Sequence, residues 1–257
     1  MSFDWSQKVV FLTGASSGIG HSLAVELGRK GAALGLLARR AETLREIVGE
    51  VEAAGGRALA LPADVKDAAA VRAAADELRE KFGRVDVLIA NAGVGVTTDA
   101  RDLKPEEVAD VIGVNVLGAV NSVTAVLPEM IERKNGHLVV ISSLAAYRGL
   151  PKSAAYCASK AAVSAFFESL RVDLNGSGVD VSIIHPGFIK TPLTAGRKSH
   201  LPYLMELDDA VKKIIRAIEA RKKSYAFPWQ LATKARVAML FPVPLYDRMI
   251  AKRSYRE

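Results

Sequence analysis

The residues from Tyr156 to Lys160, YCASK, place a phenol and an ammonium four positions apart. On a helix, residues at this spacing project from one side, so the two groups would be neighbours. A free tyrosine has a pKa near about 10, and a nearby ammonium favours its charged form. The pair could therefore transfer protons, although on an arbitrary helix the same spacing is usually an ordinary surface contact.

Small residues surround this pair, and a serine precedes it. Ser143 lies thirteen residues before Tyr156, at the end of an apolar run. A hydroxyl there could hold a carbonyl oxygen beside the phenol and stabilise developing negative charge. Its neighbour Ser142 would point to the other side of the strand. The small residues that would let a ligand approach are Ala154, Ala155, Ala158, Ala161 and Ala162.

A glycine-rich segment, TGASSGIG, follows the first apolar run and opens a helical segment. Gly14, Gly18 and Gly20 would allow a tight turn, close approach of a pyrophosphate, and close packing of helix on strand. The helix N-terminus would offer free N–H groups to phosphates. The spacing is G-x-x-x-G-x-G, and its place after the first strand favours dinucleotide binding over a plain turn.

Seven short apolar runs alternate with longer segments of helical period, which predicts an α/β protein with a parallel sheet. Most of the runs are apolar throughout, as in strands covered on both faces. We therefore predict a Rossmann-like, doubly wound parallel sheet of about seven strands, with helices on both faces and ligands at the carboxyl ends of the strands. The predicted strands are 8–14, 33–39, 57–63, 85–92, 137–143, 179–187 and 224–228, and the helices are 18–30, 41–54, 67–82, 105–133, 154–175 and 208–222.

Length and composition fit a single large domain. The chain has 257 residues, half of them hydrophobic, and no linker rich in serine, glycine or proline divides it. The first residues do not resemble a secretory signal, and no uninterrupted apolar run reaches the roughly 18 residues of a spanning helix. The single cysteine, Cys157, cannot form an intramolecular disulfide. A cytoplasmic protein is expected.

The formal net charge is +7, and much of it lies in the last thirty residues. From Pro228 onward six basic residues face two acidic ones, an excess of four. No recognition helix, zinc finger or RNA-binding aromatic pattern accompanies this charge, so a nucleic-acid partner is not expected. The tail could form short helices packed on a substrate entrance or a neighbouring subunit. Alternatively, it could make weak contact with an anionic membrane surface.

Four motifs occur in order: TGASSGIG, NAG at Asn91–Gly93, YCASK, and HPG at His185–Gly187. With them the chain closely resembles the short-chain dehydrogenase/reductase family over about residues 8–227. The resemblance implies a nicotinamide-dependent oxidoreductase that interconverts a small-molecule carbonyl and an alcohol without a metal. Residues 1–227 would form the NADP-binding domain and 228–257 a C-terminal extension of it. A homodimer or homotetramer is expected.

The resemblance also implies roles for the catalytic residues. Tyr156 would be the acid/base, Lys160 would lower its pKa and hold the nicotinamide ribose, and Ser143 would position the carbonyl. Asn115 falls within the predicted helix 105–133, where asparagine is a poor helix former and needs another reason to be present. In the family its side chain holds a water that links the lysine to solvent for proton relay.

Arg39 and Arg40 end the second predicted strand, where the adenosine ribose would lie. An arginine there suits the 2′-phosphate of NADP, and Ser16 could add a hydroxyl, so NADP(H) is the predicted cofactor. By resemblance Asp64 and Val65 border the adenine; from its position alone, Asp64 could be a simple turn residue. The resemblance places further cofactor contacts at Ser17, Ile19, Asn91, Ala92, Gly93, Pro186, Gly187, Ile189 and Thr191.

Residues 188–207 form a long irregular segment, which favours a binding loop. Its apolar residues Leu193, Leu201, Tyr203, Leu204 and Met205 could roof an apolar substrate, whereas Arg197, Lys198 and His200 could meet an anion. The apolar residues favour a hydrophobic carbonyl substrate. Two alternatives stay open: an NAD-dependent alcohol or hydroxysteroid dehydrogenase of the same family, and a non-catalytic NADPH-binding regulatory protein.

Overall fold

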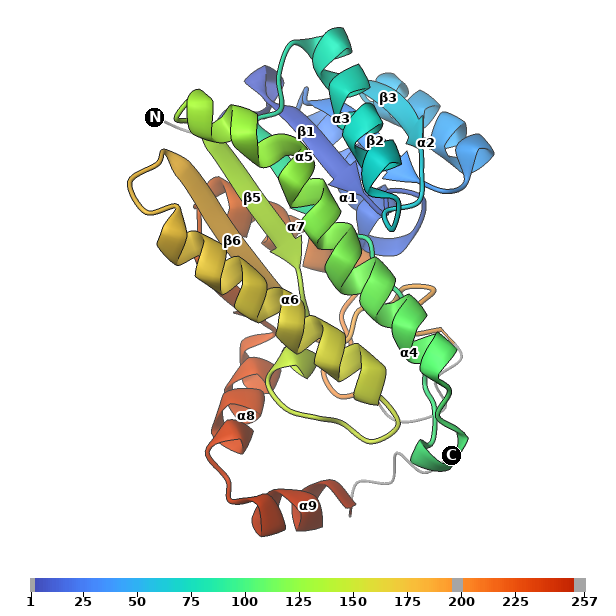
Figure 1. The fold of residues 1–257 in the computed structure, drawn as a ribbon, viewed down its shortest axis with the longest axis vertical. Coiled ribbons are helices and arrows are strands. Elements are labelled where there is room, and N and C mark those ends of the chain that lie inside the picture. Colours follow the sequence, from blue (N-terminus) through green and yellow to red (C-terminus); the bar gives the residue numbers. More distant parts are fainter. Residues whose placement is uncertain (1–2, 196–200, 252–257) are drawn as a thin grey trace.

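The computed structural model describes residues 3–195 and 201–251. Its centre is a parallel sheet of seven strands in the order β3-β2-β1-β4-β5-β6-β7 (Figure 1). The strand order reverses between β1 and β4, the point at which such sheets bind ligands. The strands are β1 (Val9–Thr13), β2 (Ala33–Ala38), β3 (Arg57–Pro62), β4 (Val87–Ala90), β5 (Gly136–Ile141), β6 (Val179–Pro186) and β7 (Ser224–Phe227).

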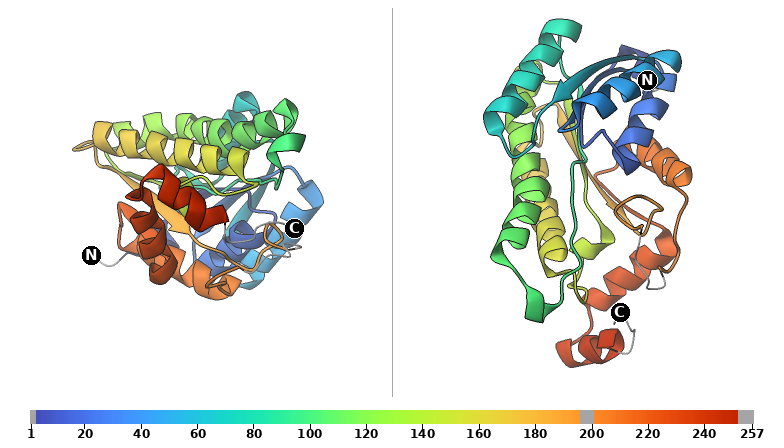
Figure 2. Two further views of the ribbon diagram at one scale, coloured as in Figure 1. Left: turned by 90° about the horizontal axis from the view of Figure 1, so that it is seen from below. Right: turned by 90° about the vertical axis from the view of Figure 1, so that its right-hand side faces the viewer.

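Helices cover both faces of the sheet, which confirms the predicted fold class. One apolar core packs α1, α2 and α7 on one face, and a second packs α3, α5 and α6 on the other (Figure 2). The helices are α1 (Gly18–Arg29), α2 (Ala41–Ala53), α3 (Ala68–Phe82), α4 (Pro105–Ile112), α5 (Gly118–Glu132), α6 (Ala154–Asp173), α7 (Leu207–Glu219), α8 (Trp229–Met239) and α9 (Val243–Ala251); short helical turns are η1 (Trp5–Gln7), η2 (Ala100–Asp102), η3 (Gly113–Leu117) and η4 (Leu144–Ala146).

Local sequence explains where these elements begin and end. The five residues of β1 are all buried, as expected of a strand covered on both faces. Helix α3 begins after Asp67, whose carboxylate accepts the N–H groups of Ala69 and Ala70. It ends at Gly83, which adopts the left-handed conformation with φ of 89°. These start and stop signals set the boundaries of α3.

The predicted helix 105–133 is one helical rod with an irregularity inside it. Between α4 and α5 lies η3, a π-helical turn in which the Gly118 N–H donates to the Gly113 carbonyl, five residues back. The rod is long and apolar enough to cross a membrane by composition, but 56% of its most apolar window is buried inside the fold. We therefore assign it as a core helix that packs on the sheet.

Helices α8 and α9 extend beyond the carboxyl ends of the strands (Figures 1 and 2). The side chains that line the cavity described below include residues of both helices and of the turn between them, such as Val237, Phe241 and Met249. Within the described residues, the tail thus forms two short helices that border this cavity.

Candidate active site

A cavity of about 730 Å³ opens at the carboxyl ends of the central strands. Its lining includes the glycine-rich loop at one end, Tyr156 and Lys160 in the middle, and residues of α8 and α9 at the other end. Of the residues predicted for the site, only Gly20 and Asn115 lie behind the wall of this cavity. The sheet thus brings together side chains that are far apart in the sequence.

The glycine-rich loop runs from β1 into α1 and leaves little room for side chains. A Cβ atom on Gly20 would lie 2.1 Å from the Gly14 carbonyl oxygen, and one on Gly14 would lie 2.6 Å from the Ala92 Cα. Gly14 and Gly18 both have positive φ, which favours glycine. Ser17 precedes α1 without a capping hydrogen bond from its side chain. The first N–H groups of α1 are thus left to meet an anion at the cavity.

Two arginines lie beside this loop at the end of β2. The Arg40 Nη2 donates to the Ser16 carbonyl at 2.8 Å and to the Ser16 hydroxyl at 3.0 Å. Arg39 is exposed and also lines the cavity. Both guanidinium groups therefore stand at the end of the cavity where an adenosine ribose would follow the glycine-rich loop.

Asp64 follows β3 and lines the same end of the cavity. Its Oδ1 accepts the backbone N–H of Lys66 at 2.9 Å, so it acts as a turn residue. Its Oδ2 is 4.0 Å from the Lys66 ammonium. The turn thus uses one carboxylate oxygen of Asp64 for the Lys66 N–H.

Asn91 ties the end of β4 to the glycine-rich loop. Its amide donates to the carbonyl oxygens of Thr13 and Gly14 at 3.0 and 3.2 Å. The next residues pass close to other site groups: a Cβ on Gly93 would lie 3.4 Å from the Lys160 Nζ. Because Ala92 and Gly93 are small, their backbone fits in the narrow space between the glycine-rich loop and Lys160 of α6.

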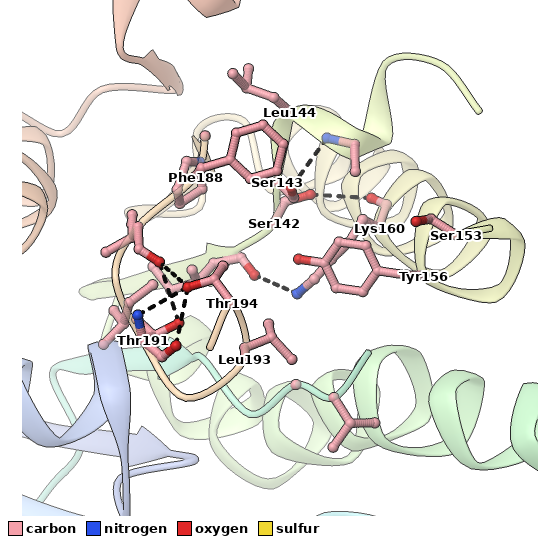
Figure 3. Close-up of a pocket in the computed structure, with 18 of the residues that line it drawn as sticks. Ser142, Ser143, Leu144, Ser153, Tyr156, Lys160, Phe188, Thr191, Leu193 and Thr194 are labelled. Carbon is pink, nitrogen blue, oxygen red and sulfur yellow. Dashed lines mark hydrogen bonds between the residues drawn. The ribbon is translucent and has the colours of Figure 1, made fainter. Parts of the chain in front are cut away.

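Tyr156 and Lys160 project from the first turns of α6 into the cavity (Figure 3). The Lys160 Nζ donates to the Ile141 carbonyl at 2.8 Å and lies 5.8 Å from the centre of the Tyr156 ring. The lysine side chain is only 5% exposed. Burial lowers the pKa of Lys160 to about 8, so its ammonium is still the major form at neutral pH.

The two serines after β5 have different partners. The Ser142 hydroxyl donates to the Lys160 carbonyl at 3.2 Å and pairs with the Ser164 hydroxyl at 2.7 Å. The Ser143 hydroxyl accepts the Ala145 N–H at 3.1 Å and keeps its own proton for another acceptor. Ser142 is therefore occupied by α6, and Ser143 is the hydroxyl available on the cavity side.

Asn115 lies in the π-helical turn and is 2% exposed. Its amide oxygen accepts the Val94 N–H at 2.8 Å, and its amide nitrogen donates to the Val94 carbonyl and the Ser159 hydroxyl at 2.9 and 2.8 Å. Both N–H bonds of the amide are thereby used. A water could bind the side chain only through the remaining lone pair of the oxygen.

The segment after β6 forms another wall of the cavity, with Pro186, Gly187, Ile189 and Thr191. The Thr194 hydroxyl accepts the Thr191 N–H at 3.1 Å and donates to the Ile189 carbonyl at 2.6 Å, which fixes the turn. His185, just before it, is buried and stacks on Tyr147 with ring centres 5.1 Å apart. Burial lowers the pKa of His185, consistent with a neutral packing residue.

The binding-loop prediction for residues 188–207 holds only in part. Leu193 lines the cavity, but Tyr203 and Leu204 are exposed. Met205 instead packs toward the core next to α7, because its backbone pairs with Phe188 and Lys190. The basic residues predicted for an anion, Arg197, Lys198 and His200, lie outside the described residues.

Several residues around the site carry no sequence signal. Gly95 lies so close that a Cβ there would be 3.1 Å from the Tyr156 ring; only its place after NAG hints at this. Arg148 lies shortly after η4, and its guanidinium stacks 4.0 Å from the centre of the Tyr246 ring; both residues line the cavity. The apolar lining residues of this part of the chain are Leu144, Leu150, Phe188, Leu231, Val237, Phe241, Met249 and Ile250, and the polar ones include Lys234.

These features fit a nicotinamide dinucleotide. The glycine-rich loop leaves a cradle that a Cβ would fill, α1 offers uncapped N–H groups, and arginines stand at the ribose end. Lys160 lies farther along the same cavity, at the place where the reactive ring would follow.

Comparison with known proteins agrees with this architecture. Residues 8–202 match the family model for short chain dehydrogenase. An uncharacterized oxidoreductase of Myxococcus xanthus is 46% identical over 244 residues, which cover 95% of this chain and 96% of the relative.

Two solved structures are also similar. A short chain dehydrogenase/reductase from Burkholderia phymatum in complex with NAD has a TM-score of 0.85 and 26% identity, covering 99% of this chain and 98% of that one. A metagenomic short-chain oxidoreductase in complex with NADP has a TM-score of 0.74 and 32% identity, covering 88% and 97%. With its matching motifs, sheet order and cavity, this chain belongs to the short-chain dehydrogenase family of oxidoreductases.

Proposed function

We propose that this protein is an NADP(H)-dependent reductase that reversibly interconverts an apolar ketone or aldehyde and its alcohol. The observation that carries the proposal is that Tyr156, Lys160 and Ser143 line one cavity, which has two arginines at its glycine-loop end. When bound, the nicotinamide supplies or accepts a hydride at the carbonyl carbon. The protein has to supply a proton to the carbonyl oxygen and to orient the substrate.

Tyr156 is the proposed proton donor to the carbonyl oxygen. Its phenol shares the cavity with the Lys160 ammonium, which lies 5.8 Å from the ring centre and stabilises the phenolate left after transfer. The ammonium is held in place by its hydrogen bond to the Ile141 carbonyl. We propose that its remaining N–H bonds hold the nicotinamide ribose.

Ser143 is the proposed second contact of the carbonyl oxygen. Because its hydroxyl accepts from the Ala145 N–H, its proton is directed away from that bond and can be donated to substrate. A donor held in this way stabilises the negative charge that develops on the oxygen.

Asn115 is the proposed support of proton supply to Lys160. A Cβ on Gly93 would be 3.5 Å from the Asn115 Oδ1 and 3.4 Å from the Lys160 Nζ, so both groups flank one backbone position. The amide has one lone pair free for a water. The π-helical turn also displaces backbone carbonyls from the regular ladder, as π-turns at functional sites often do.

NADP(H) is proposed over NAD because of the basic side chains at the ribose end. Arg39 and Arg40 would pair with the 2′-phosphate, and the Ser16 hydroxyl already lies 3.0 Å from the Arg40 Nη2. Asp64, Val65 and the strand-end residues Asn91, Ala92, Gly93, Pro186, Gly187, Ile189 and Thr191 would line the rest of the dinucleotide, with the phosphates at Ser17, Gly18 and Ile19.

An apolar substrate is proposed from the lining of the far end. Leu144, Leu150, Phe188, Leu231 and Phe241 contribute hydrocarbon surface there. Among the described residues that line the cavity, Asp64 is the one acid, and it lies at the opposite end. An uncharged ketone or aldehyde with a hydrophobic body suits this surface better than a cationic one.

The Tyr156→Phe variant tests the reaction. Its turnover of apolar ketones with NADPH should fall by about 10³-fold or more, because acid catalysis of this kind contributes about 10² to 10⁴ and the phenol is its only proposed source. Binding of NADPH, followed by nucleotide fluorescence, should be unchanged. Equal turnover of native and variant proteins would remove the mechanism. No turnover by the native protein across ketones, aldehydes and hydroxysteroids would favour a non-catalytic NADPH-binding protein.

The Arg39→Ala and Arg40→Ala variants test the cofactor. Loss of a charge-assisted bond to the phosphate should weaken NADPH affinity by about tenfold or more and leave NADH affinity within about twofold. A native protein that prefers NADH, or variants that lose both cofactors equally, would support the NAD-dependent alternative.

We also propose a cytoplasmic homodimer or homotetramer with a 1–227 cofactor domain and a 228–257 extension. Membership of a family that is typically oligomeric supports the assembly, and light scattering on the purified protein would measure it.

A further inference from the structure

The turn between α8 and α9 carries a run of exposed apolar residues. We call residues 239–245 the C-terminal tip. Leu240 is 82% exposed and Val243 64% exposed, and Met239 and Leu245 are each about half exposed. Pro242 and Pro244 within the run are exposed as well. Single exposed hydrophobic residues are ordinary on protein surfaces, but a contiguous run marks an interaction site.

The tip is held firmly at its base. The Arg148 Nη1 donates to the Phe241 carbonyl at 2.8 Å and also to the Ala238 carbonyl. The guanidinium stacks on Tyr246, whose hydroxyl donates to the Gly149 carbonyl at 2.6 Å. These contacts fix the inward side of the tip, so its outward residues face solvent because of the fold and not because the end of the chain is loose.

Basic residues flank the apolar run on both sides. Arg236 lies one helical turn before Leu240, and Arg248 lies three residues after Leu245, so each base shares a helix side with an exposed leucine. Both bases are exposed. Asp247 is the one acid among the described residues of 228–251. The tip is thus an apolar centre with a cationic rim.

This charge pattern selects between two occupants. A second copy of the chain related by two-fold symmetry would bring the same basic residues toward one another, which is unfavourable. An anionic lipid surface would instead pair its headgroups with the bases and accept the apolar residues below them.

We propose that the C-terminal tip docks the protein on an anionic membrane surface, with Leu240 and Val243 in the acyl boundary and Arg236 and Arg248 at the headgroups. Phe241, Met249 and Ile250 of the same segment line the cavity. Docking would therefore hold the far end of the cavity next to the bilayer. An apolar carbonyl compound dissolved in the bilayer would then reach the site over a short path; this last step rests on the reductase function proposed above.

Vesicle sedimentation tests the docking. The full chain is mixed with vesicles of phosphatidylcholine containing about one third phosphatidylglycerol, and with pure phosphatidylcholine vesicles. Binding should be at least about tenfold stronger to the anionic vesicles and should fall with added salt. The Leu240→Ser/Val243→Ser variant should lose more than about tenfold in affinity, because it removes apolar burial. Arg236→Gln and Arg248→Gln should each lose about fivefold.

A matched control is available on the opposite end of the fold. Val172 on α6 is 62% exposed, close to the value of Val243, so Val172→Ser should leave vesicle binding unchanged. Absence of binding by the native protein, or an equal loss with Val172→Ser, would overturn the proposal. So would a tip variant that changes the oligomeric state in light scattering without vesicles, because a second copy would then be the occupant.

Turnover separates this inference from the proposed reaction. With NADPH, anionic vesicles should raise the rate on a membrane-dissolved long-chain ketone at least severalfold for the native protein but not for the tip variant. Turnover of a small water-soluble ketone should be equal in both. Vesicle binding without any turnover would leave the docking standing and remove the reductase function.

Discussion

Replacing Lys160 by methionine removes a charged group that folding buries, and the structure predicts how stability then depends on pH. Burial lowers the pKa of the Lys160 ammonium from its ordinary 10.5 to about 8 in the folded protein. Methionine keeps the hydrocarbon stem of the side chain and cannot titrate. The difference in the free energy of unfolding between the native protein and this variant therefore isolates the cost of the buried charge.

The sign of the effect follows from proton binding. Between about pH 8 and about pH 10.5 the unfolded chain holds the Lys160 proton and the folded chain has released it, so stability rises with pH in this window. At and below about pH 7 both states are protonated, and the folded state bears the full cost of the buried ammonium. From about pH 7 to about pH 10 the native protein should gain roughly 2 to 3 kcal/mol relative to Lys160→Met.

Urea unfolding followed by circular dichroism at intervals across this range measures the gain. Both proteins should carry Tyr156→Phe, so that the neighbouring phenol does not titrate in either. Lys81 on α3 is exposed, and Lys81→Met provides the control: its difference from the parent protein should stay constant over the same range. A constant difference for Lys160→Met as well would show that the ammonium is not desolvated, and the reasoning would fail.

Three further substitutions test the surroundings of the site. A Cβ at Gly95 would displace the Tyr156 ring, so Gly95→Ala should lower kcat by about tenfold or more. Gly49→Ala is the control, because a Cβ there meets nothing, and its kcat should not change. Equal kcat values for Gly95→Ala and the native protein would contradict the geometry. Asn115→Leu removes three hydrogen bonds and should cost about 2 to 4 kcal/mol in urea unfolding; a loss below about 1 kcal/mol would refute it. Arg148→Met should speed limited proteolysis after α8 by about tenfold, and an unchanged cleavage rate would show that the arginine does not hold the tip.

The sheet and its helices were predictable because their local signals are strong. Strands buried on both faces stand out as apolar runs, and the structure places each of the seven within about two residues of its predicted bounds. The different surroundings of Ser142 and Ser143 were predictable too, because alternate residues of a strand face opposite sides; the Ser142 hydroxyl bonds to α6, whereas the role of Ser143 stays a prediction.

The sequence indicated that Asn115 is unusual but did not predict the π-helical turn around it. Asparagine inside an apolar helix signals that something other than helix propensity keeps it there. The extra residue of the turn leaves no local mark, because it depends on the fit of Asn115 to Val94 and Ser159 across the fold. Register changes of this kind are set by tertiary contacts.

The far end of the cavity was the least predictable part. Arg148 lies in an irregular loop and bonds to carbonyls about ninety residues later, and no periodic pattern connects positions so distant. The tail was recognisable as apolar and basic, but the sequence left its position open among a substrate entrance, a neighbouring subunit and a membrane surface; the structure places it beside the cavity. In the substrate loop, Tyr203 and Leu204 point outward because Met205 takes the inward position beside β6 and α7.

The π-helical turn between α4 and α5 also constrains how this chain can change over generations. Each residue of an α-helix advances the chain by about 100° around the helix axis, so the extra residue sets the rotational phase of α4 relative to α5. A point substitution can weaken the turn but cannot restore a regular helix, since that needs the loss of one residue. Such a deletion would swing every side chain of α4 by about 100° and turn its apolar face away from α6. The turn is thus protected against gradual loss, and relatives that keep the length of this segment are expected to keep Asn115 pointing inward.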